Sequence, residues 1–361
     1  MNRREIGLQE FSRATGGRGP VATERVREAS RVLADGVDRF IFADVFSHSG
    51  LGSREREMIT VTVLAAIGGA DNQLGVHVPA ALECGADPEE LLQLCEQIAP
   101  YCGFPRALNA LRAVRGVLEE RGIALPPPPI ELELEDHGTL ATSVGTGESG
   151  LLLLHSPETD RRVWRDVIAA LPAGTRAVAP DLRGLGSAAG APHPAELATL
   201  VDDLSNVLDA CELSRVRVVT LGATASLGVA LAIADQERVK DLVLVAPAAG
   251  HTGIPPGPET LATHLMPTTL AVNGWGARYA RDRLERLDVD GWTNAERVFA
   301  GADLWVAPQP TRVVDGMYGD HVTSTAAAET WGVEPVTYIP DASRLVPLEA
   351  PADLVEVLSA S

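Results

Sequence analysis

A histidine and three arginines between residues 54 and 107 are of types that could carry acid–base chemistry on an acidic molecule. His77 lies in a stretch with helical periodicity, and its imidazole titrates near neutral pH, so it could donate or accept a proton at a pocket. Arg54, Arg56 and Arg106 could hold a carboxylate through forked hydrogen bonds.

Each of these residues also has a purely structural interpretation. A lone histidine on a helix can be a core residue bonded to a backbone carbonyl. For any one arginine, a solvated charge at a helix end is the simpler explanation. Glu57 and Glu96 flank the candidate site in the sequence and could be surface acids.

The neighbouring sequence predicts helices that would position these side chains. Residues 54–68 place apolar side chains along a wide stripe, and a pair of glycines ends the run. Leu74 and Val78 begin a second helical repeat, with His77 on the neighbouring face. Asp87 can cap a third helix, because it is followed by proline and two glutamates.

Four motifs in this region occur together at characteristic spacings. They are G-L-G-S-R-E-R-E, L-x-x-H, G-x-x-P-E-E-L and Y-C-G-F-P-R-A, centred on residues 51–107. With these motifs the first 120 residues or so resemble the carboxymuconolactone decarboxylase family. The resemblance implies an all-helical, usually oligomeric domain, and its decarboxylase branch removes CO2 from a cyclic lactone acid.

Two departures from that family pattern bear on the chemistry. The peroxidase-linked branch carries a C-x-x-C pair, and Cys95 and Cys102 are too far apart to form one, so the redox branch is set aside. Family sequences often have an arginine where this chain has His48, which leaves the substrate open.

A proline run marks the clearest domain boundary. Residues 123–129 read I-A-L-P-P-P-P, which predicts a stiff linker between a helical domain at 1–122 and a second domain at 130–361. Residues 1–20 are polar and glycine-rich and are expected to be loosely ordered. Beyond the linker, strands alternate with helices, which predicts a parallel sheet covered on both faces, with an exposed edge strand at 130–134.

The second domain resembles the α/β-hydrolase fold over nearly its whole length. The sequence L-L-L-L-H-S-P at 151–157 matches the strand and turn that build part of the oxyanion hole, which makes His155 a candidate contact to a substrate. The loop P-D-L-R-G-L-G-S at 180–187 is typical of the family. Residues 251–304 interrupt the alternation and are expected to form a lid.

The hydrolase motifs are altered at the positions that carry catalysis. The turn that should read G-x-S-x-G reads G-A-T-A-S, which places Thr224 at the nucleophile position, with Ser226 as a second register. Arg344 occupies the slot of the general base, and arginine stays protonated. Asp320 keeps the acid position, and His321 beside it could substitute for the base. An Asp320–Arg344 ion pair could instead close the pocket or bind an acidic ligand.

Composition excludes some partner classes. The 361 residues are 45% hydrophobic and 22% charged, and the net charge of −19 argues against nucleic acid and anionic membranes as partners. We found no run of about 18 apolar residues and no export signal, so we expect reduced thiols in the cytoplasm. No cofactor or metal site is predicted. Lys240 is the only lysine, so Schiff-base chemistry has one candidate.

These observations favour a multidomain protein: an all-α carboxymuconolactone decarboxylase-like domain, then an α/β-hydrolase-fold domain similar to 3-oxoadipate enol-lactonases with an altered triad. The leading hypothesis is a carboxy-lyase acting on a small cyclic acid. It is expected to form a homo-oligomer through the helical domain. The alternatives are a lactonase or esterase of the hydrolase family, and a binding or assembly protein without catalysis.

Overall fold

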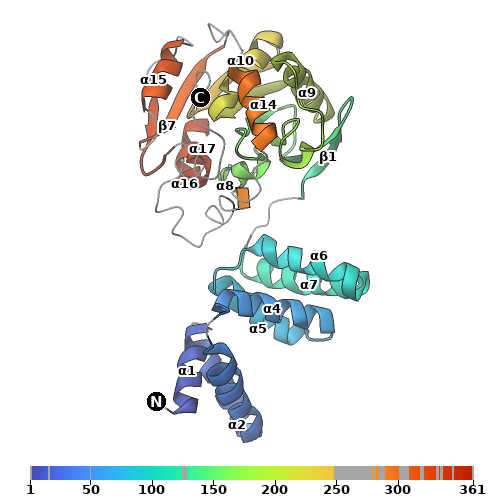
Figure 1. The fold of residues 1–361 in the computed structure, drawn as a ribbon, viewed down its shortest axis with the longest axis vertical. Helices are drawn as coiled ribbons and strands as arrows, with labels where there is room; N and C mark the ends of the chain where they lie inside the picture. Colours follow the sequence, from blue (N-terminus) through green and yellow to red (C-terminus); the bar gives the residue numbers. More distant parts are fainter. Residues whose placement is uncertain are drawn as a thin grey trace. The chain divides into compact units, whose positions relative to one another are not determined.

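The computed structural model describes residues 2–14, 17–48, 50–123, 128–247, 279, 282–283, 289–300, 309–317, 321–330, 333, 336–343 and 345–359. The chain divides into two compact units, Met1–Leu125 and Pro126–Ser361. The first unit is helical and the second is built on one sheet (Figure 1). An all-helical region followed by a mixed α/β sheet is the fold class expected from the sequence.

The helical unit contains eight helices among its described residues, one of them with π-type hydrogen bonding. Their bounds are α1 (Arg3–Ala14), α2 (Arg18–Ala29), α3 (Arg31–Asp35), η1 (Gly36–Phe46), α4 (Ser53–Ile67), α5 (Asp71–Glu83), α6 (Pro88–Cys102) and α7 (Phe104–Glu120).

Local sequence signals fix the ends of the central helices. The side chain of Asp87 accepts a hydrogen bond from the Glu89 amide at 2.9 Å, and the Glu90 carboxylate accepts one from the Asp87 amide at 2.7 Å. This reciprocal cap starts α6. Gly68 ends α4 with φ of 75°, a left-handed conformation that glycine adopts without steric cost.

The first twenty residues differ from the expectation of loose order. Residues Arg3–Ala14 form α1, and Asn2 and Glu5 cap its start reciprocally. The ring of Phe11 stacks on Phe42 of η1, with 3.8 Å between the ring centroids. This aromatic contact supplies an anchor that the polar composition of the segment does not indicate.

The core of the helical unit is formed by α4 to α7. Its buried side chains recur at helical spacing, so each helix turns one face inward. Val61 and Ala65 come from α4, Leu74 and Val78 from α5, and Val114 from α7.

The second unit contains one eight-stranded sheet with the order β1-β2-β4-β3-β5-β6-β7-β8. The pairs β1–β2 and β2–β4 are antiparallel, and all the other pairs are parallel. A short turn joins β1 to β2, and such a turn can only connect antiparallel neighbours. The strands are β1 (Ile130–Glu133), β2 (Gly138–Val144), β3 (Ser149–Leu154), β4 (Ala177–Pro180), β5 (Arg215–Leu221), β6 (Val239–Val245), β7 (Thr311–Gly316) and β8 (Thr337–Ile339).

Helices cover both faces of this sheet, as the sequence predicts (Figure 1). Alternate residues of β3 show this: Leu152 and Leu154 belong to one core cluster, and Leu151 and Leu153 belong to the other. The first cluster packs under α9 (Leu197–Ala210), α10 (Ala225–Ala234), α14 (Val289–Ala300) and α15 (His321–Thr330). The second packs under η2 (Arg161–Trp164), α8 (Arg165–Ala170), α16 (Val346–Glu349) and α17 (Pro351–Ser359).

The expected lid at 251–304 is described only at Tyr279, Asp282, Arg283 and α14, and its other residues lie outside the described structure. None of the described helices combines the length and the apolar character that crossing a bilayer requires.

Candidate functional site

In the helical unit, the structure pairs His77 with a buried carboxylate. Nδ1 of His77 on α5 lies 2.8 Å from Oε2 of Glu57 on α4. The Glu57 side chain is 1% exposed, whereas the His77 side chain is 31% exposed. Nδ1 is therefore occupied by Glu57, and Nε2 remains as the nitrogen that can exchange a proton with a ligand.

Sequence reasoning left Glu57 as a possible surface acid, and the structure corrects that view. Glu57 stands four and eight residues before Val61 and Ala65, which are both buried. The i, i+4, i+8 spacing puts all three on one face of α4, and this signal could have identified it. Glu96 is exposed on α6, as a surface acid would be.

Burial raises the pKa of two cysteine thiols in the helical unit. Burial, with a smaller contribution from the negative charge of Glu57, raises the pKa of Cys84. Burial also raises the pKa of Cys95 to about 11. Both thiols are therefore protonated and weakly nucleophilic at neutral pH.

The three arginines expected to contact a substrate are each engaged within the helical unit. Arg54 donates to the Gly85 carbonyl at 3.2 Å and to Glu90 at 2.5 Å. Arg56 donates to the carbonyls of Leu51 and His48 at 3.1 and 3.0 Å.

Arg106 closes the carboxyl end of α4. Its guanidinium donates to the Ala66 carbonyl at 2.5 Å and to the Ile67 carbonyl. These contacts satisfy acceptors that a helix end leaves open. All three arginines therefore have a structural role, and their contact with a substrate carboxylate stays a prediction.

In the sheet unit, the turn after β5 has its left-handed residue at Gly222, with φ of 63°. A Cβ atom at this position would lie 3.2 Å from Cβ of Ser156. Thr224, two residues later, is fully buried. Its hydroxyl donates to the Leu221 carbonyl at 2.9 Å and accepts from the Leu221 amide at 3.2 Å. Ser226 is buried in α10.

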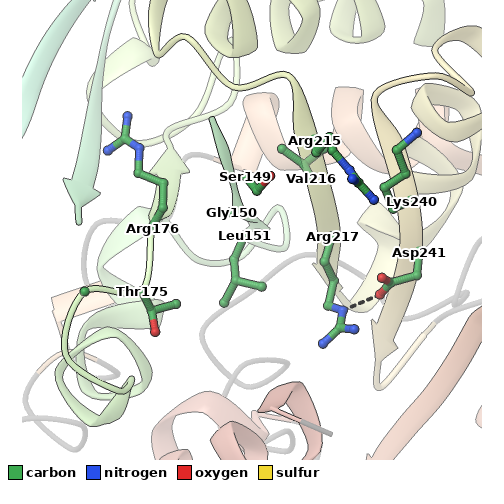
Figure 2. A pocket seen from close by; sticks show the side chains of 11 residues that line it. Ser149, Gly150, Leu151, Thr175, Arg176, Arg215, Val216, Arg217, Lys240 and Asp241 are labelled. Carbon is green, nitrogen blue, oxygen red and sulfur yellow. Dashed lines mark hydrogen bonds and ion pairs between the residues drawn. The ribbon is translucent and has the colours of Figure 1, made fainter. Parts of the chain in front are cut away.

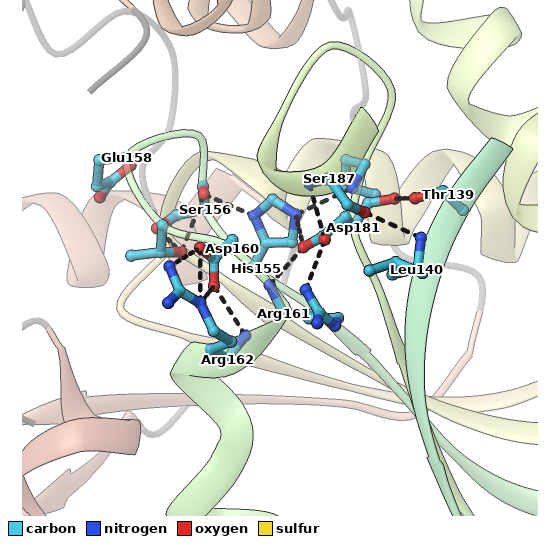
Figure 3. Close-up of polar contacts among 12 residues, drawn as sticks. Thr139, Leu140, His155, Ser156, Glu158, Asp160, Arg161, Arg162, Asp181 and Ser187 are labelled. Carbon is cyan, nitrogen blue, oxygen red and sulfur yellow. Dashed lines mark hydrogen bonds and ion pairs between the residues drawn. The ribbon is translucent and has the colours of Figure 1, made fainter. Parts of the chain in front are cut away.

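His155 is fully buried between the loops that follow β3 and β4 (Figure 3). The Leu182 amide donates to Nε2 at 3.0 Å, so Nδ1 carries the proton and donates to the Ser156 carbonyl at 2.9 Å. Burial lowers the pKa of the imidazole. Both ring nitrogens are occupied, so His155 braces these loops, and this geometry replaces the expected contact with a substrate.

Asp181 holds the same loops together beside His155 (Figure 3). Its carboxylate accepts from the Arg161 amide at 2.8 Å, from the Arg161 guanidinium at 2.9 Å and from the Ser187 amide at 2.9 Å. These bonds connect η2 with the loop that follows β4.

A family model described as "Alpha/beta hydrolase family" matches residues 151–359, which is more than half of the chain. The chain belongs to the alpha/beta hydrolase family. A second model, described as "Carboxymuconolactone decarboxylase family", matches residues 32–116. The protein is therefore a fusion of a carboxymuconolactone decarboxylase-family domain with an alpha/beta hydrolase domain.

Individual proteins resemble each domain. A 4-carboxymuconolactone decarboxylase of Acinetobacter baylyi is 29% identical over 101 residues, which cover 28% of this chain and 75% of that protein. A thermophilic esterase from Thermogutta terrifontis is 20% identical, with a TM-score of 0.54 over 64% of this chain and 97% of the esterase. An enol-lactonase from Burkholderia xenovorans LB400 is 18% identical, with a TM-score of 0.53 over 63% and 98%. At these identities the structural likeness concerns the fold.

Within the alpha/beta hydrolase fold, the nucleophile stands on a strained turn between strand and helix. The sequence register placed Thr224 there, but the left-handed residue of this turn is Gly222. Thr224 has helical dihedral angles, and its hydroxyl is bonded back to the end of β5. The positive φ of this turn therefore lies two residues before Thr224, at a residue without a side chain.

The remaining candidates of the hydrolase domain lie outside the described residues. They are Asp320, Arg344 and the side chain of His321, of which only the backbone is described as the first residue of α15. Their roles stay predictions.

Described residues of the lid region contact the loop after β3. The Tyr279 hydroxyl accepts from the Asp160 amide at 2.9 Å. Arg162 lies over the Tyr279 ring, with its guanidinium carbon 5.2 Å from the ring centroid, and it pairs with Asp282 at 3.1 Å. Burial raises the pKa of Tyr279 well above its usual value, so the phenol stays neutral.

Proposed function

We propose that the helical domain is a carboxy-lyase acting on a small cyclic carboxylic acid, derived from a lactone or an aromatic compound. The hydrogen bond between His77 and the buried carboxylate of Glu57 carries this proposal. A buried carboxylate orients an imidazole and stabilises its protonated form. The likeness to the Acinetobacter baylyi decarboxylase supports the same reaction class.

In the proposed step, the bond between the ring carbon and the carboxylate carbon breaks. CO2 leaves, and the electron pair passes into the conjugated carbonyl of the substrate as a dienolate. His77 then delivers a proton from Nε2 to carbon, and the imidazole regains a proton from water. Glu57 stays ionised and holds His77 through Nδ1.

For the alpha/beta hydrolase domain we propose ligand binding without formation of an acyl-enzyme. The observation that favours this is glycine at the strained position of the elbow, because Gly222 has no atom that could attack an ester. Ser226, on which a lactonase or esterase would depend, is buried in α10. The retained fold supports a binding cleft more strongly than it supports hydrolysis.

Release of CO2 from small cyclic carboxylic acids tests the decarboxylase proposal, beginning with 4-carboxymuconolactone. His77→Asn should lower the rate by about 10²–10⁴-fold, the range for loss of a proton-transfer residue. Glu57→Gln should lower the rate as well, because a neutral amide stabilises an imidazolium less than a carboxylate does. Gln73→Asn is the control, since Gln73 is exposed on the same helix as His77.

The circular dichroism spectrum and the mass in solution should be unchanged in all three variants. Undiminished CO2 release by His77→Asn, on an acid that the wild-type protein turns over, would remove His77 from the mechanism. If the wild-type protein releases no CO2 from any acid of the panel, the carboxy-lyase proposal fails.

A further inference from the structure

The amino ends of the parallel strands form a depression on the edge of the sheet that faces away from the elbow (Figure 2). Ser149 begins β3 there, Arg215 begins β5, and Lys240 is the second residue of β6. Gly222 follows the other end of β5, which is seven residues long, or roughly 20 Å. The depression is therefore separate from the candidate site of the hydrolase fold.

Four cationic side chains and one carboxylate line this depression. Arg217 is neutralised, because it pairs with Asp241 and also donates to the Leu358 carbonyl. In Figure 2 Arg217 turns to Asp241, while Arg215 and Lys240 extend away from that pair. Asp241 therefore compensates the charge of only one of the four cations.

The other three cations have no carboxylate partner within the described part of the chain. Arg176 donates to the Ser143 hydroxyl at 2.5 Å and to the Cys211 carbonyl at 3.1 Å, both uncharged. Lys240 donates to the Glu237 carbonyl, and the exposed Arg215 makes no ion pair among the described residues. Carbonyl acceptors hold a guanidinium or ammonium in place but leave its positive charge uncompensated.

The chain has 49 acidic and 30 basic residues, yet three cations without a carboxylate partner among the described residues line this one depression. Like charges on neighbouring strands repel each other, and a bound anion relieves that repulsion. We propose that this depression binds a small molecule with two or more anionic oxygens, such as a phosphate or a dicarboxylate. Arg215 and Lys240 are its ligands, and Arg176, whose guanidinium donates to the Ser143 hydroxyl and to backbone carbonyls, adds only its positive charge.

The size of the depression favours a small molecule. Its volume is about 410 Å³, within the range of small-molecule sites, and it is open to solvent. Two exposed cations at the rim can converge on one dianion, and the arginine fork matches the oxygen geometry of carboxylate and phosphate. This inference does not depend on decarboxylation in the helical domain.

Lys240 allows a direct test, because it is the only lysine in the chain. The full-length protein is acetylated with an amine-selective active ester at constant ionic strength, with and without inorganic phosphate or succinate. Mass mapping of peptides follows the acetylation of Lys240, and the amino terminus serves as an internal reference. An anion at ten times its dissociation constant should slow acetylation of Lys240 about tenfold, and the terminal amine should react at an unchanged rate.

Variants separate a specific site from general screening. Arg215→Ala removes one charge-assisted partner of the anion. Roughly 10- to 100-fold more anion should then be needed for the same protection of Lys240 from acetylation. Arg238→Ala is the matched control, because Arg238 lies outside the depression and pairs with Asp209 at 2.9 Å and Asp235 at 3.1 Å.

Slower acetylation of Lys240 in the presence of either anion supports the site. The anion that protects Lys240 at the lower concentration identifies the ligand class. Equal acetylation rates with and without both anions overturn the proposal. Undiminished protection in Arg215→Ala overturns it as well.

Discussion

The helical domain and the sheet domain differ in the apolar surface that they leave exposed. Among the described residues, fifteen of the eighteen exposed large apolar side chains belong to the helical domain, which is the smaller of the two. The three in the sheet domain are Ile130, Ile233 and Met317. A sheet with helices on both faces closes its own core, whereas a thin layer of helices has a second face that needs another covering surface.

The two domains also differ in the chemistry at their candidate sites. The helical domain pairs His77 with a buried acid, and the hydrolase elbow carries Gly222. Among the described residues of the sheet domain, the eight strands and both core clusters are nevertheless in place. Burial of apolar surface maintains a fold, and single side chains carry a reaction, so one can persist when the other is altered.

The largest expected effect concerns covalent chemistry in the sheet domain. A serine-directed phosphonate probe should leave the full-length protein unmodified under conditions that label a triad hydrolase completely. Loss of the nucleophile lowers the rate in triad enzymes by several orders of magnitude. Intact mass spectrometry makes the measurement, with an active serine hydrolase as control. An adduct on Ser226 or Thr224 would show that a base activates a side chain outside the elbow.

A second effect concerns self-association of the helical domain. Ile59, Val63 and Ile67 are exposed at i, i+4 and i+8 on α4 and form one apolar stripe. Changing all three to serine should weaken association at least about a thousandfold, if each contributes about 1.5–3 kcal/mol on burial. Light scattering reports the mass, and Ile233→Ser in the sheet domain is the control. A monomeric mass for wild-type segment 1–122 or for the wild-type full chain would contradict self-association.

A third, smaller effect compares the same substitution in the two domains. Leu154→Ala in the fully buried β3 should cost about 2–5 kcal/mol of unfolding free energy. Leu108→Ala on the exposed face of α7 should change it by less than about 0.5 kcal/mol in dilute protein. Urea unfolding, followed separately for each domain, measures both. Similar losses in the two variants would mean that the helical face is already covered.

The smallest effect is a pH dependence in the sheet domain. Burial lowers the pKa of His155 in the folded state, so the unfolded chain takes up a proton as pH falls below about 6.5 and the folded chain does not. The unfolding free energy therefore falls with decreasing pH, by at most about 1.4 kcal/mol per pH unit. His155→Gln should remove this part of the difference between pH 7.5 and pH 5.5.

The exposed His193→Gln is the control for the pH experiment. Thermal unfolding of the three proteins at both pH values gives the comparison. Identical pH dependence in wild type and His155→Gln would contradict a lowered pKa of this imidazole in the folded state.

Much of the fold follows from local sequence. The period of apolar residues predicts the helices of the first domain and the buried strands of the second, and the proline run at 123–129 predicts a stiff linker between two domains. The sequence predicts the cap of α6 by Asp87, because this cap involves residues two and three positions apart. The sequence does not predict the ordered helix at residues 3–14, because that helix depends on a contact with Phe42 some thirty residues away.

Domain order, fold class and most of the candidate residues can be predicted from the sequence, because periodicity and short motifs are properties of neighbouring residues. Which of these residues meet depends on how helices and strands pack. Glu57 and His77 are twenty residues apart and touch because α4 packs on α5, which no local pattern specifies. The residue with positive φ in the turn after β5 likewise depends on where β5 ends, and the pairing of β5 with its neighbouring strands sets that end.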